Sequence, residues 1–276
     1  MRNPLVSIIV TTKNEEKHIA NCLESIKKQS YKNIEIIVVD NNSSDRTKRI
    51  TEKYTKNIFN KGPERSAQRN FGAKKAKGEY LLFLDADMIL TKNVVKNCVS
   101  QIEKTEAEGL IIPEKSFGTS WWAKTKALER SFYIRNDAIE AARFYSTKIF
   151  KKIGGFDEKL TGPEDWDLSQ RVKATYMVTR IQDFILHNEG KLSLFDTIKK
   201  KYYYSKKIVA YLSKKESHKT KSKQTNIFGR YWIFLKHPKK LFQHPLLGIS
   251  VLFMKTLEFA AGACGIIYYN FFPYEQ

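Results

Sequence analysis

The chain has 276 residues, of which 42% are apolar, 13% aromatic and 28% charged. This length and composition suit one large or two modest domains with a buried core, and they exclude a disordered tail, a collagen-like repeat and a disulfide scaffold. Lys and Arg outnumber Asp and Glu by 49 to 29, giving a formal net charge of +20. A charge of this size favours polyanionic partners such as nucleic acid, anionic lipid or phosphorylated substrates.

Short apolar runs alternate with helical patterns in the first two thirds of the chain. Apolar residues at positions 19, 22, 23 and 26 have the spacing of an amphipathic helix, and the pattern recurs at 94, 95, 98 and 102. Runs of this kind between helices are typical of buried parallel strands. We therefore expect an α/β domain over residues 1–190, with a mainly parallel twisted sheet and helices on both faces. The expected strands are residues 6–10, 34–39, 80–84 and 110–112.

The remaining residues, 191–276, predict a basic and aromatic helical region. Residues 191–247 carry 15 Lys or Arg against two acids, and residues 246–272 are mostly apolar. Lys255 and Glu258 interrupt the apolar stretch, and one charge at the centre of a membrane-spanning helix costs about 2.5–3.5 kcal/mol. The stretch 246–272 is therefore expected to associate with a membrane, most simply as an in-plane or re-entrant helix. A true span and a soluble packing helix are the alternatives.

Cysteine usage and the N-terminus bear on the compartment. Cys22, Cys98 and Cys264 are odd in number and have no metal-ligand spacing, which favours a reducing environment. The short apolar segment after Met1 does not resemble a signal peptide. We expect the protein at the cytoplasmic face of the cell membrane, as a peripheral or monotopic protein.

Polar clusters follow three of the expected strands. They are TTKNE (11–15), DNNSSD (40–45) and DAD (85–87). Ligands of parallel α/β sheets bind beyond the carboxyl ends of the strands, so all three clusters are expected at one edge. Helix capping or turn formation is the alternative for the second cluster. Two acids spaced as Asp85 and Asp87 can both reach a hard divalent cation, which commonly bridges to substrate phosphates.

A second acidic cluster comes later, in GPEDWD (162–167). One carboxylate held beside a cationic phosphate site can remove a proton from an attacking hydroxyl. The alternative is that these acids only stabilise the first turn of a helix.

Five segments in this order resemble the family 2 glycosyltransferases, which have the GT-A fold. They are PLVSIIVTTKNEE, IIVVDNNSSDRT, ERSAQRNFGAKKAKGEYLLFLDADM, FKKIGGFDEKL and GPEDWDLSQR, and the resemblance covers residues 4–190. It implies an inverting, metal-dependent transfer of a sugar, such as a hexose, from a nucleoside-diphosphate sugar, with Mg or Mn as the divalent metal.

The resemblance also implies roles for individual residues on the donor side. The stretch after the first strand borders the nucleotide, an acid after the second strand contacts the base, and an arginine lines the nucleotide pocket. A further acid faces the ribose and donor sugar. These residues are, in order, Thr11, Asn14 and Glu15, then Asp40, Arg69 and Asp85.

The remaining implied roles concern the metal and the chemistry. Asp87 matches the metal ligand that holds the diphosphate, and Asp165 matches the catalytic base. Glu164 lies beside Asp165 on the side of the acceptor. His187 has the position of a further metal ligand in some relatives, and a structural histidine at the end of a strand is the alternative.

The acceptor is expected to be lipid-linked, such as a polyprenyl phosphate or diphosphate or an oligosaccharide-lipid. The segment 114–145 contains aromatic rings and guanidinium groups suited to a phosphate, and the basic tail suits a membrane surface. Core packing or membrane contact is the alternative for the two tryptophans. The residues concerned are Trp121, Trp122, Arg130, Arg135 and Arg143.

Two other classes of function compete with this interpretation. A sugar nucleotidyltransferase is expected to carry a glycine-rich basic loop after the first strand, whereas this chain has TTKNEE. A non-catalytic function in binding membrane or nucleic acid would explain the positive charge, but it would not explain the two acidic clusters. Because the charge flanks an apolar tail rather than a nucleic-acid-reading motif, we expect no nucleic-acid partner.

Overall fold

The computed structural model describes residues 2–214 and 224–271, and these fall into two compact units. The first unit consists of residues 1–114, 141–158 and 164–188, and the second of residues 115–140, 159–163 and 189–276. The predicted boundary near residue 190 separates the largest stretch of the second unit from the rest. The division into two domains as such stays a prediction.

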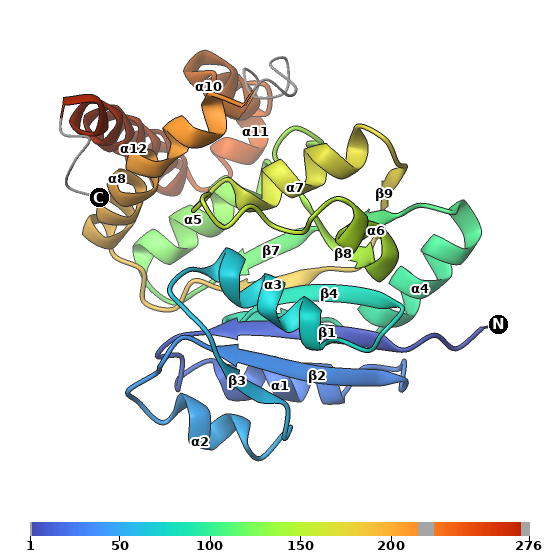
Figure 1. Cartoon of the computed structure of the whole chain (residues 1–276). Coiled ribbons are helices and arrows are strands. Elements are labelled where there is room, and N and C mark those ends of the chain that lie inside the picture. The colour runs from blue at the N-terminus through green and yellow to red at the C-terminus, as the bar shows by residue number, and fades with distance from the viewer. Residues whose placement is uncertain (1, 215–223, 272–276) are drawn as a thin grey trace. The chain divides into compact units, whose positions relative to one another are not determined.

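A seven-stranded sheet forms the centre of the first unit (Figure 1). Its strand order is β3-β2-β1-β4-β8-β6-β9. Strand β1 runs parallel to β2 and β4, whereas β8 is antiparallel to both of its neighbours. The prediction of a mainly parallel sheet is therefore confirmed, with one reversed strand inside it. The strands are β1 (Val6–Thr12), β2 (Ile34–Asp40), β3 (Ile58–Asn60), β4 (Tyr80–Asp85), β6 (Gly109–Ile111), β8 (Ala142–Ser146) and β9 (Val178–Arg180).

Helices cover both faces of this sheet, because the central strands carry apolar side chains on both of their faces. In β1, Ile8 and Val10 pack in one core while Ile9 packs in the other. The first core takes residues from α1 and α4, and the second takes residues from α3, α6 and α7, so the predicted layering is confirmed. The helices of this unit are α1 (Ile19–Lys27), α2 (Thr47–Thr51), α3 (Arg65–Lys75), α4 (Val94–Thr105), α6 (Thr147–Lys152) and α7 (Glu164–Lys173).

Helix α3 packs tightly against the sheet at Gly72. A Cβ atom at Gly72 would come within 2.5 Å of Ile9, so only glycine fits this crossing without displacing the strand residue. The Gln68 amide, one turn earlier, donates to the carbonyl oxygens of Thr12 and Val39 at 3.1 and 2.7 Å. These contacts fix the direction in which the arginines of α3 project.

A short antiparallel pair adjoins the end of β4. Strand β5 (Met88–Leu90) pairs with β10 (Ile185–Asn188), and His187 lies opposite Met88. This pairing brings the end of the 85–87 acidic turn to a histidine 100 residues later. Strand β7 (Glu114–Phe117) begins at Glu114, which is the last residue of the 1–114 stretch of the first unit.

The second unit is mainly helical in the described residues, apart from residues 115–117 of β7. Its elements are α5 (Trp121–Ser131), α8 (Leu194–Leu212), α10 (Ile227–Leu235), α11 (Pro238–Leu241) and α12 (Pro245–Phe271). The predicted helical tail is thus confirmed. The polar stretch 214–225, for which the sequence predicts a loop, lies mostly outside the described residues, as does residue 272 of the apolar stretch. Among those residues, only α12 is long and apolar enough to cross a membrane.

Candidate functional site

The carboxyl ends of β1, β2 and β4 meet at one edge of the sheet. Thr12 lies opposite Asp40 and Thr11 lies opposite Asp85 in the strand register. The Thr11 hydroxyl donates to Asp85 Oδ1 at 3.0 Å. Parallel pairing therefore brings the three predicted polar clusters to the same edge, as the sequence predicts.

Asn14 and Asp40 are joined through one serine. The Asp40 carboxylate accepts hydrogen bonds from the Ser43 backbone N–H at 2.7 Å and from its hydroxyl at 2.5 Å. The same hydroxyl accepts from the Asn14 backbone at 2.8 Å, and the Asn14 side chain accepts from the backbone of Ser44 at 2.9 Å. Asn14 and Asn42 both have positive φ, which asparagine tolerates better than most residues. The two predicted nucleotide-side loops thus form one polar structure.

Glu15 lies between this loop structure and the acidic turn. Its backbone N–H donates to the Thr47 hydroxyl at 2.7 Å, and its carboxylate contacts His18 Nδ1 at 2.8 Å. Burial raises the pKa of Glu15, and the hydrogen bond from His18 only partly opposes this effect. Because the charges of Asp87 and Asp85 raise the same pKa, Glu15 belongs to the acidic side of the site.

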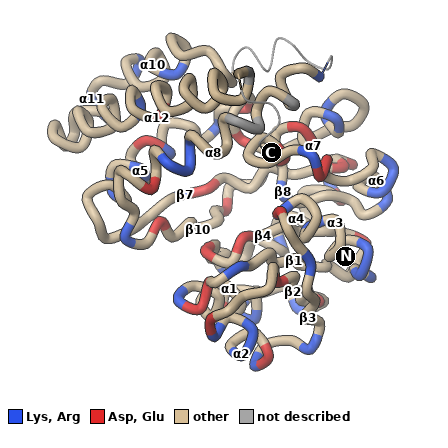
Figure 2. Tube along the Cα trace, turned by 60° about the vertical axis from the view of Figure 1, so that its left-hand side comes forward, with Lys and Arg blue, Asp and Glu red and all other residues tan. Residues whose placement is uncertain are grey.

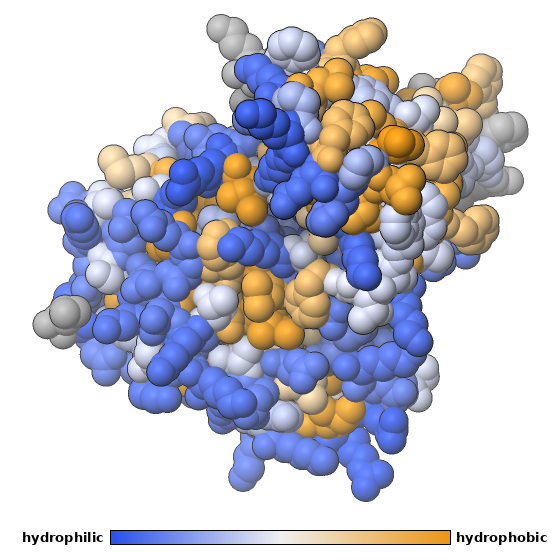
Figure 3. Space-filling view, turned by 180° about the vertical axis from the view of Figure 1, so that it is seen from behind, coloured by the Kyte–Doolittle hydropathy of each residue, from blue (hydrophilic) through white to orange (hydrophobic). Residues whose placement is uncertain are grey.

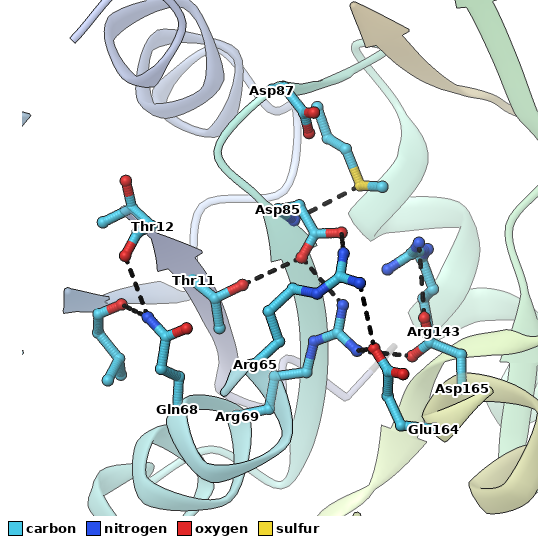
Figure 4. Close-up of polar contacts among 12 residues, drawn as sticks. Thr11, Thr12, Arg65, Gln68, Arg69, Asp85, Asp87, Arg143, Glu164 and Asp165 are labelled. Carbon is cyan, nitrogen blue, oxygen red and sulfur yellow. Dashed lines mark hydrogen bonds and ion pairs between the residues drawn. The ribbon is translucent and has the colours of Figure 1, made fainter. Parts of the chain in front are cut away.

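Arg69 is the central residue of the site, and it is completely buried (Figure 4). Its guanidinium joins two carboxylates that are distant in sequence, Asp85 Oδ1 at 2.9 Å and Asp165 Oδ1 at 2.8 Å. Glu164 Oε1 lies 3.5 Å from Arg69 Nη1. Burial alone would lower the pKa of Arg69, but the charges of Asp165, Asp85 and Glu164 raise it. The arginine is therefore a permanent cation that holds the acids of two motifs together.

Arg65 supports the same acids from one helical turn earlier. It lies 3.7 Å from Asp85 Oδ2 and 3.6 Å from Glu164 Oε1, and its side chain is about one-third exposed. Burial opposes ionisation of Asp85, yet Arg69, Arg65 and Arg143 hold its pKa well below the ordinary value. Arg65 was not among the predicted site residues. The sequence contains a signal for Arg65, because residues four apart on a helix share a face and Arg69 is a predicted site residue.

The acids of the second cluster open helix α7, where negative charge is favourable. Glu164 is only 1% exposed and is directed to the two arginines. Burial raises the pKa of Glu164, and the charge of Asp165 adds to that rise. Asp165 is more exposed, and its Oδ2 lies 3.9 Å from Arg143 Nη2. The role of Glu164 towards an acceptor stays a prediction.

A line of charged contacts runs on from Asp165 to the acidic turn. Arg143 Nε donates to Glu114 Oε1 at 2.6 Å, and Glu114 Oε2 lies 3.3 Å from His187 Nδ1. The other ring nitrogen of His187 is 3.2 Å from Asp87 Oδ2. Asp87 and Asp165 are therefore linked through three intervening side chains.

The chemistry of Asp87 and His187 suits a divalent ion. A histidine that binds a metal through one nitrogen usually has its other nitrogen held by a carboxylate, as Glu114 holds Nδ1 here. Among residues 2–214 and 224–271, no three His, Cys, Asp or Glu side chains converge on a single metal position. An ion held by these two donors would complete its shell from phosphate oxygens and water.

The residues predicted for the acceptor fall into different parts of the fold. Arg143 belongs to the line of contacts just described. Trp121, Trp122, Arg130 and Arg135 belong to the second unit. There, Trp121 Nε1 donates to the Ser250 hydroxyl at 3.0 Å, and the Trp122 ring lies 6.5 Å from that of Phe253. The packing alternative for the tryptophans thus has support.

Curated relatives of this chain are glycosyltransferases. An uncharacterized glycosyltransferase of Rickettsia typhi is 31% identical over 183 residues, which are 60% of this chain and 58% of the relative. An uncharacterized glycosyltransferase of Methanocaldococcus jannaschii is 29% identical over 74% of this chain and 78% of its own length. The poly(ribitol-phosphate) beta-N-acetylglucosaminyltransferase TarS of Staphylococcus aureus is 35% identical over 40% of this chain and 21% of its own. The chain spans little more than half of the first relative.

Solved structures share the fold at low identity. The mannosyltransferase PcManGT from Pyrobaculum calidifontis, in complex with GDP-Man and Mn²⁺, has a TM-score of 0.69 and 15% identity, over 97% of this chain and 88% of that one. TarS residues 1–349 in complex with UDP have a TM-score of 0.56 and 17% identity, over 99% and 93%. Residues 7–156 match the family described as Glycosyl transferase family 2. The chain therefore belongs to glycosyl transferase family 2 and has the GT-A fold.

Proposed function

We propose that this enzyme transfers a sugar from a nucleoside-diphosphate sugar to a hydroxyl or phosphate of a lipid-linked acceptor, with inversion of the anomeric configuration. The observation that carries this proposal is the line of contacts from Asp87 to Asp165 described above. It joins a pair of donors suited to a metal–diphosphate group to a carboxylate suited to proton removal. Both requirements of the transfer are thus met within one connected set of side chains.

The donor side of the proposal rests on the sheet edge. Thr11, Asn14, Glu15 and Asp40 border the nucleoside, and Asp85 faces the ribose and sugar. Asp87 and His187 would hold a divalent ion, which would neutralise charge on the departing diphosphate when bound. PcManGT was solved with GDP-Man and Mn²⁺, and TarS with UDP, which supports this use of the edge.

In the chemical step one proton is transferred, one bond forms and one bond breaks. The acceptor oxygen attacks the anomeric carbon as Asp165 takes its proton, and the bond to the diphosphate oxygen breaks on the opposite face. Arg69 binds Asp165 Oδ1, so Oδ2, which lies 3.9 Å from Arg143 Nη2, is the oxygen that takes the acceptor proton. Since Arg65 is partly exposed beside Asp85, it can offset phosphate charge as the bond breaks.

The second unit supports the proposed acceptor and the proposed compartment. Its basic residues and apolar helix suit a lipid carrier and the cytoplasmic face of a membrane, where a peripheral or monotopic enzyme would meet both substrates. We accordingly propose the transfer as a step in glycan or glycoconjugate assembly.

A panel of nucleotide sugars tests this function. The wild-type protein is expected to release nucleoside diphosphate from one member of the panel, to do so faster with a polyprenyl phosphate in detergent, and to stop when a chelator removes the metal. Release of pyrophosphate would indicate a nucleotidyltransferase instead. Good transfer to soluble sugars with no response to lipid carriers would overturn the proposed acceptor.

Replacing Asp87 by Asn tests the metal site. The Mn²⁺ concentration needed for half-maximal activity is expected to rise by at least about tenfold, because an oxygen ligand loses its charge. Asp183→Asn is the control, because Asp183 is bonded to Asn97 in the same unit. An unchanged metal requirement in Asp87→Asn would contradict the assignment.

A further inference from the structure

Helix α12 exposes apolar side chains and buries its charged ones, which is the opposite of a surface helix on a soluble protein. Its exposed positions recur every three or four residues and form one stripe along the helix. From Leu246 to Phe271 the stripe is about 37 Å long at 1.5 Å per residue, and it contains no charged side chain. The large exposed members are Leu246, Ile249, Phe253, Ile267 and Phe271.

The charges of α12 point the other way. Lys255 and Glu258 are 7% and 4% exposed, and they bond to each other. Each also binds an opposite charge on α5: Lys255 pairs with Glu129, and Glu258 Oε1 lies 2.7 Å from Lys126 Nζ. Lys126 and Glu129 are themselves 2.8 Å apart. This closed set of four charges fixes which face of α12 is turned inward.

Helix α10 continues the exposed apolar surface. Phe228 is 87% exposed, and Trp232 and Leu235 follow on the same helical face. The Tyr231 hydroxyl, next to Trp232, bonds to the Thr256 hydroxyl at 2.6 Å, and Thr256 belongs to the exposed stripe of α12. The two apolar faces therefore adjoin. Figure 3 shows hydrophobic side chains gathered over these helices at its upper right.

The charge around this surface has one sign. Between residues 224 and 271 the only acid is Glu258, which is buried, whereas Lys236, Lys239 and Lys240 are exposed between α10 and α12. Figure 2 shows α10, α11 and α12 almost wholly free of acidic segments. Apolar and aromatic side chains flanked by lysines match the boundary between anionic headgroups and acyl chains.

We infer that the exposed faces of α10, α11 and α12 are a docking surface for the interface of an anionic bilayer, with α12 lying in the membrane plane. A transmembrane α12 would carry Lys255 and Glu258 into the hydrocarbon and draw in their α5 partners, beside Lys124 and Arg130. When α12 lies in the membrane plane, the four charged side chains stay away from the lipid and only the apolar stripe enters the bilayer interface. This inference deepens the proposed membrane association, on which it rests.

Binding to vesicles without donor or acceptor tests the surface separately from transfer. The binding measurement needs two kinds of vesicle, one of pure phosphatidylcholine and one that also contains about 30% phosphatidylglycerol. Trp232→Ser is expected to weaken binding about tenfold, because a large aromatic side chain no longer enters the interface. Met177→Ser is the matched control: both side chains are 59% exposed, and Met177 belongs to the first unit.

Charge variants test the headgroup contribution. Lys236→Gln with Lys239→Gln is expected to weaken binding to the anionic vesicles by at least about tenfold and to leave binding to pure phosphatidylcholine unchanged. Lys27→Gln with Lys53→Gln, exposed lysines of the first unit, is the control. Equal binding by Trp232→Ser and Met177→Ser, or no binding by the wild type, would overturn the inference. So would a dimer that Trp232→Ser dissociates without any loss of vesicle binding.

The depth of α12 is measured from Cys264. This cysteine is exposed on the apolar stripe, while Cys22 and Cys98 are buried, so a thiol-reactive fluorophore attaches at one position. Shallow lipid-borne quenchers are expected to act more strongly than quenchers at the bilayer centre; the reverse order would indicate a span. Vesicle binding by an enzyme that uses only soluble acceptors would refute the proposed acceptor and leave this surface intact.

Discussion

Asp165→Asn is expected to lower turnover by at least about 100-fold while the nucleoside diphosphate still binds with near-native affinity. The expected loss is the low end for removal of a general base. Donor binding is expected to persist because the groups proposed to bind the nucleotide and metal lie on β1, β2, β4, their loops and β10, whereas Asp165 lies in the first turn of α7. Steady-state kinetics and calorimetric titration with the diphosphate and Mn²⁺ measure the two quantities separately.

The control for this variant is Asp167→Asn on the same helix. Asp167 pairs with Arg171 at 2.9 Å, so its loss affects packing without touching Arg69. We expect its turnover to stay within a few-fold of wild type wherever the protein is folded. Near-native turnover in Asp165→Asn would remove this residue from the mechanism.

Arg69→Met is expected to lower the free energy of unfolding by about 3–5 kcal/mol, the usual cost of removing one partner from a buried ion pair. The variant leaves Asp85, Glu164 and Asp165 close together beside Arg65 and Arg143, without the buried cation that binds all three acids. Chemical denaturation followed by circular dichroism measures the change.

Two further variants serve as controls for the Arg69 prediction. Arg46→Met removes an exposed pair with Glu16 and is expected to leave the free energy of unfolding nearly unchanged. Arg69→Lys keeps the charge but cannot bind two carboxylates in the same fork, so its stability should fall between those of Arg69→Met and wild type. A loss below about 1 kcal/mol in both Arg69 variants would show that the acids do not depend on this cation.

Burial imposes periodic apolar patterns, and these patterns made strands β1, β2, β4 and β6 and helices α1 and α4 predictable. Ile19, Cys22, Leu23 and Ile26 are all buried in α1, as their spacing predicts. The reversed strand β8 was not predicted, because it comes late in the chain and inserts between β4 and β6. Its place depends on pairing partners, which a local pattern does not specify.

The same limit applies to the site. The meeting of Thr11, Asp40 and Asp85 follows from parallel strands, since their carboxyl ends must share an edge. The contacts of Arg143 with Glu114 and Asp165 join β8 to β7 and α7, so they require knowledge of the tertiary fold. Likewise, the pairing of Lys255 with Glu258 was foreseeable from their spacing, but their partners on α5 were not.

The anomeric configuration of the product tests the central claim most directly. With the donor found in the panel, proton NMR of the first transfer product should show the configuration opposite to that of the sugar in the donor. Asp165 as base on the face away from the diphosphate requires this outcome. A product that retains the configuration of the donor would contradict single-step displacement, and with it the role given to Asp165.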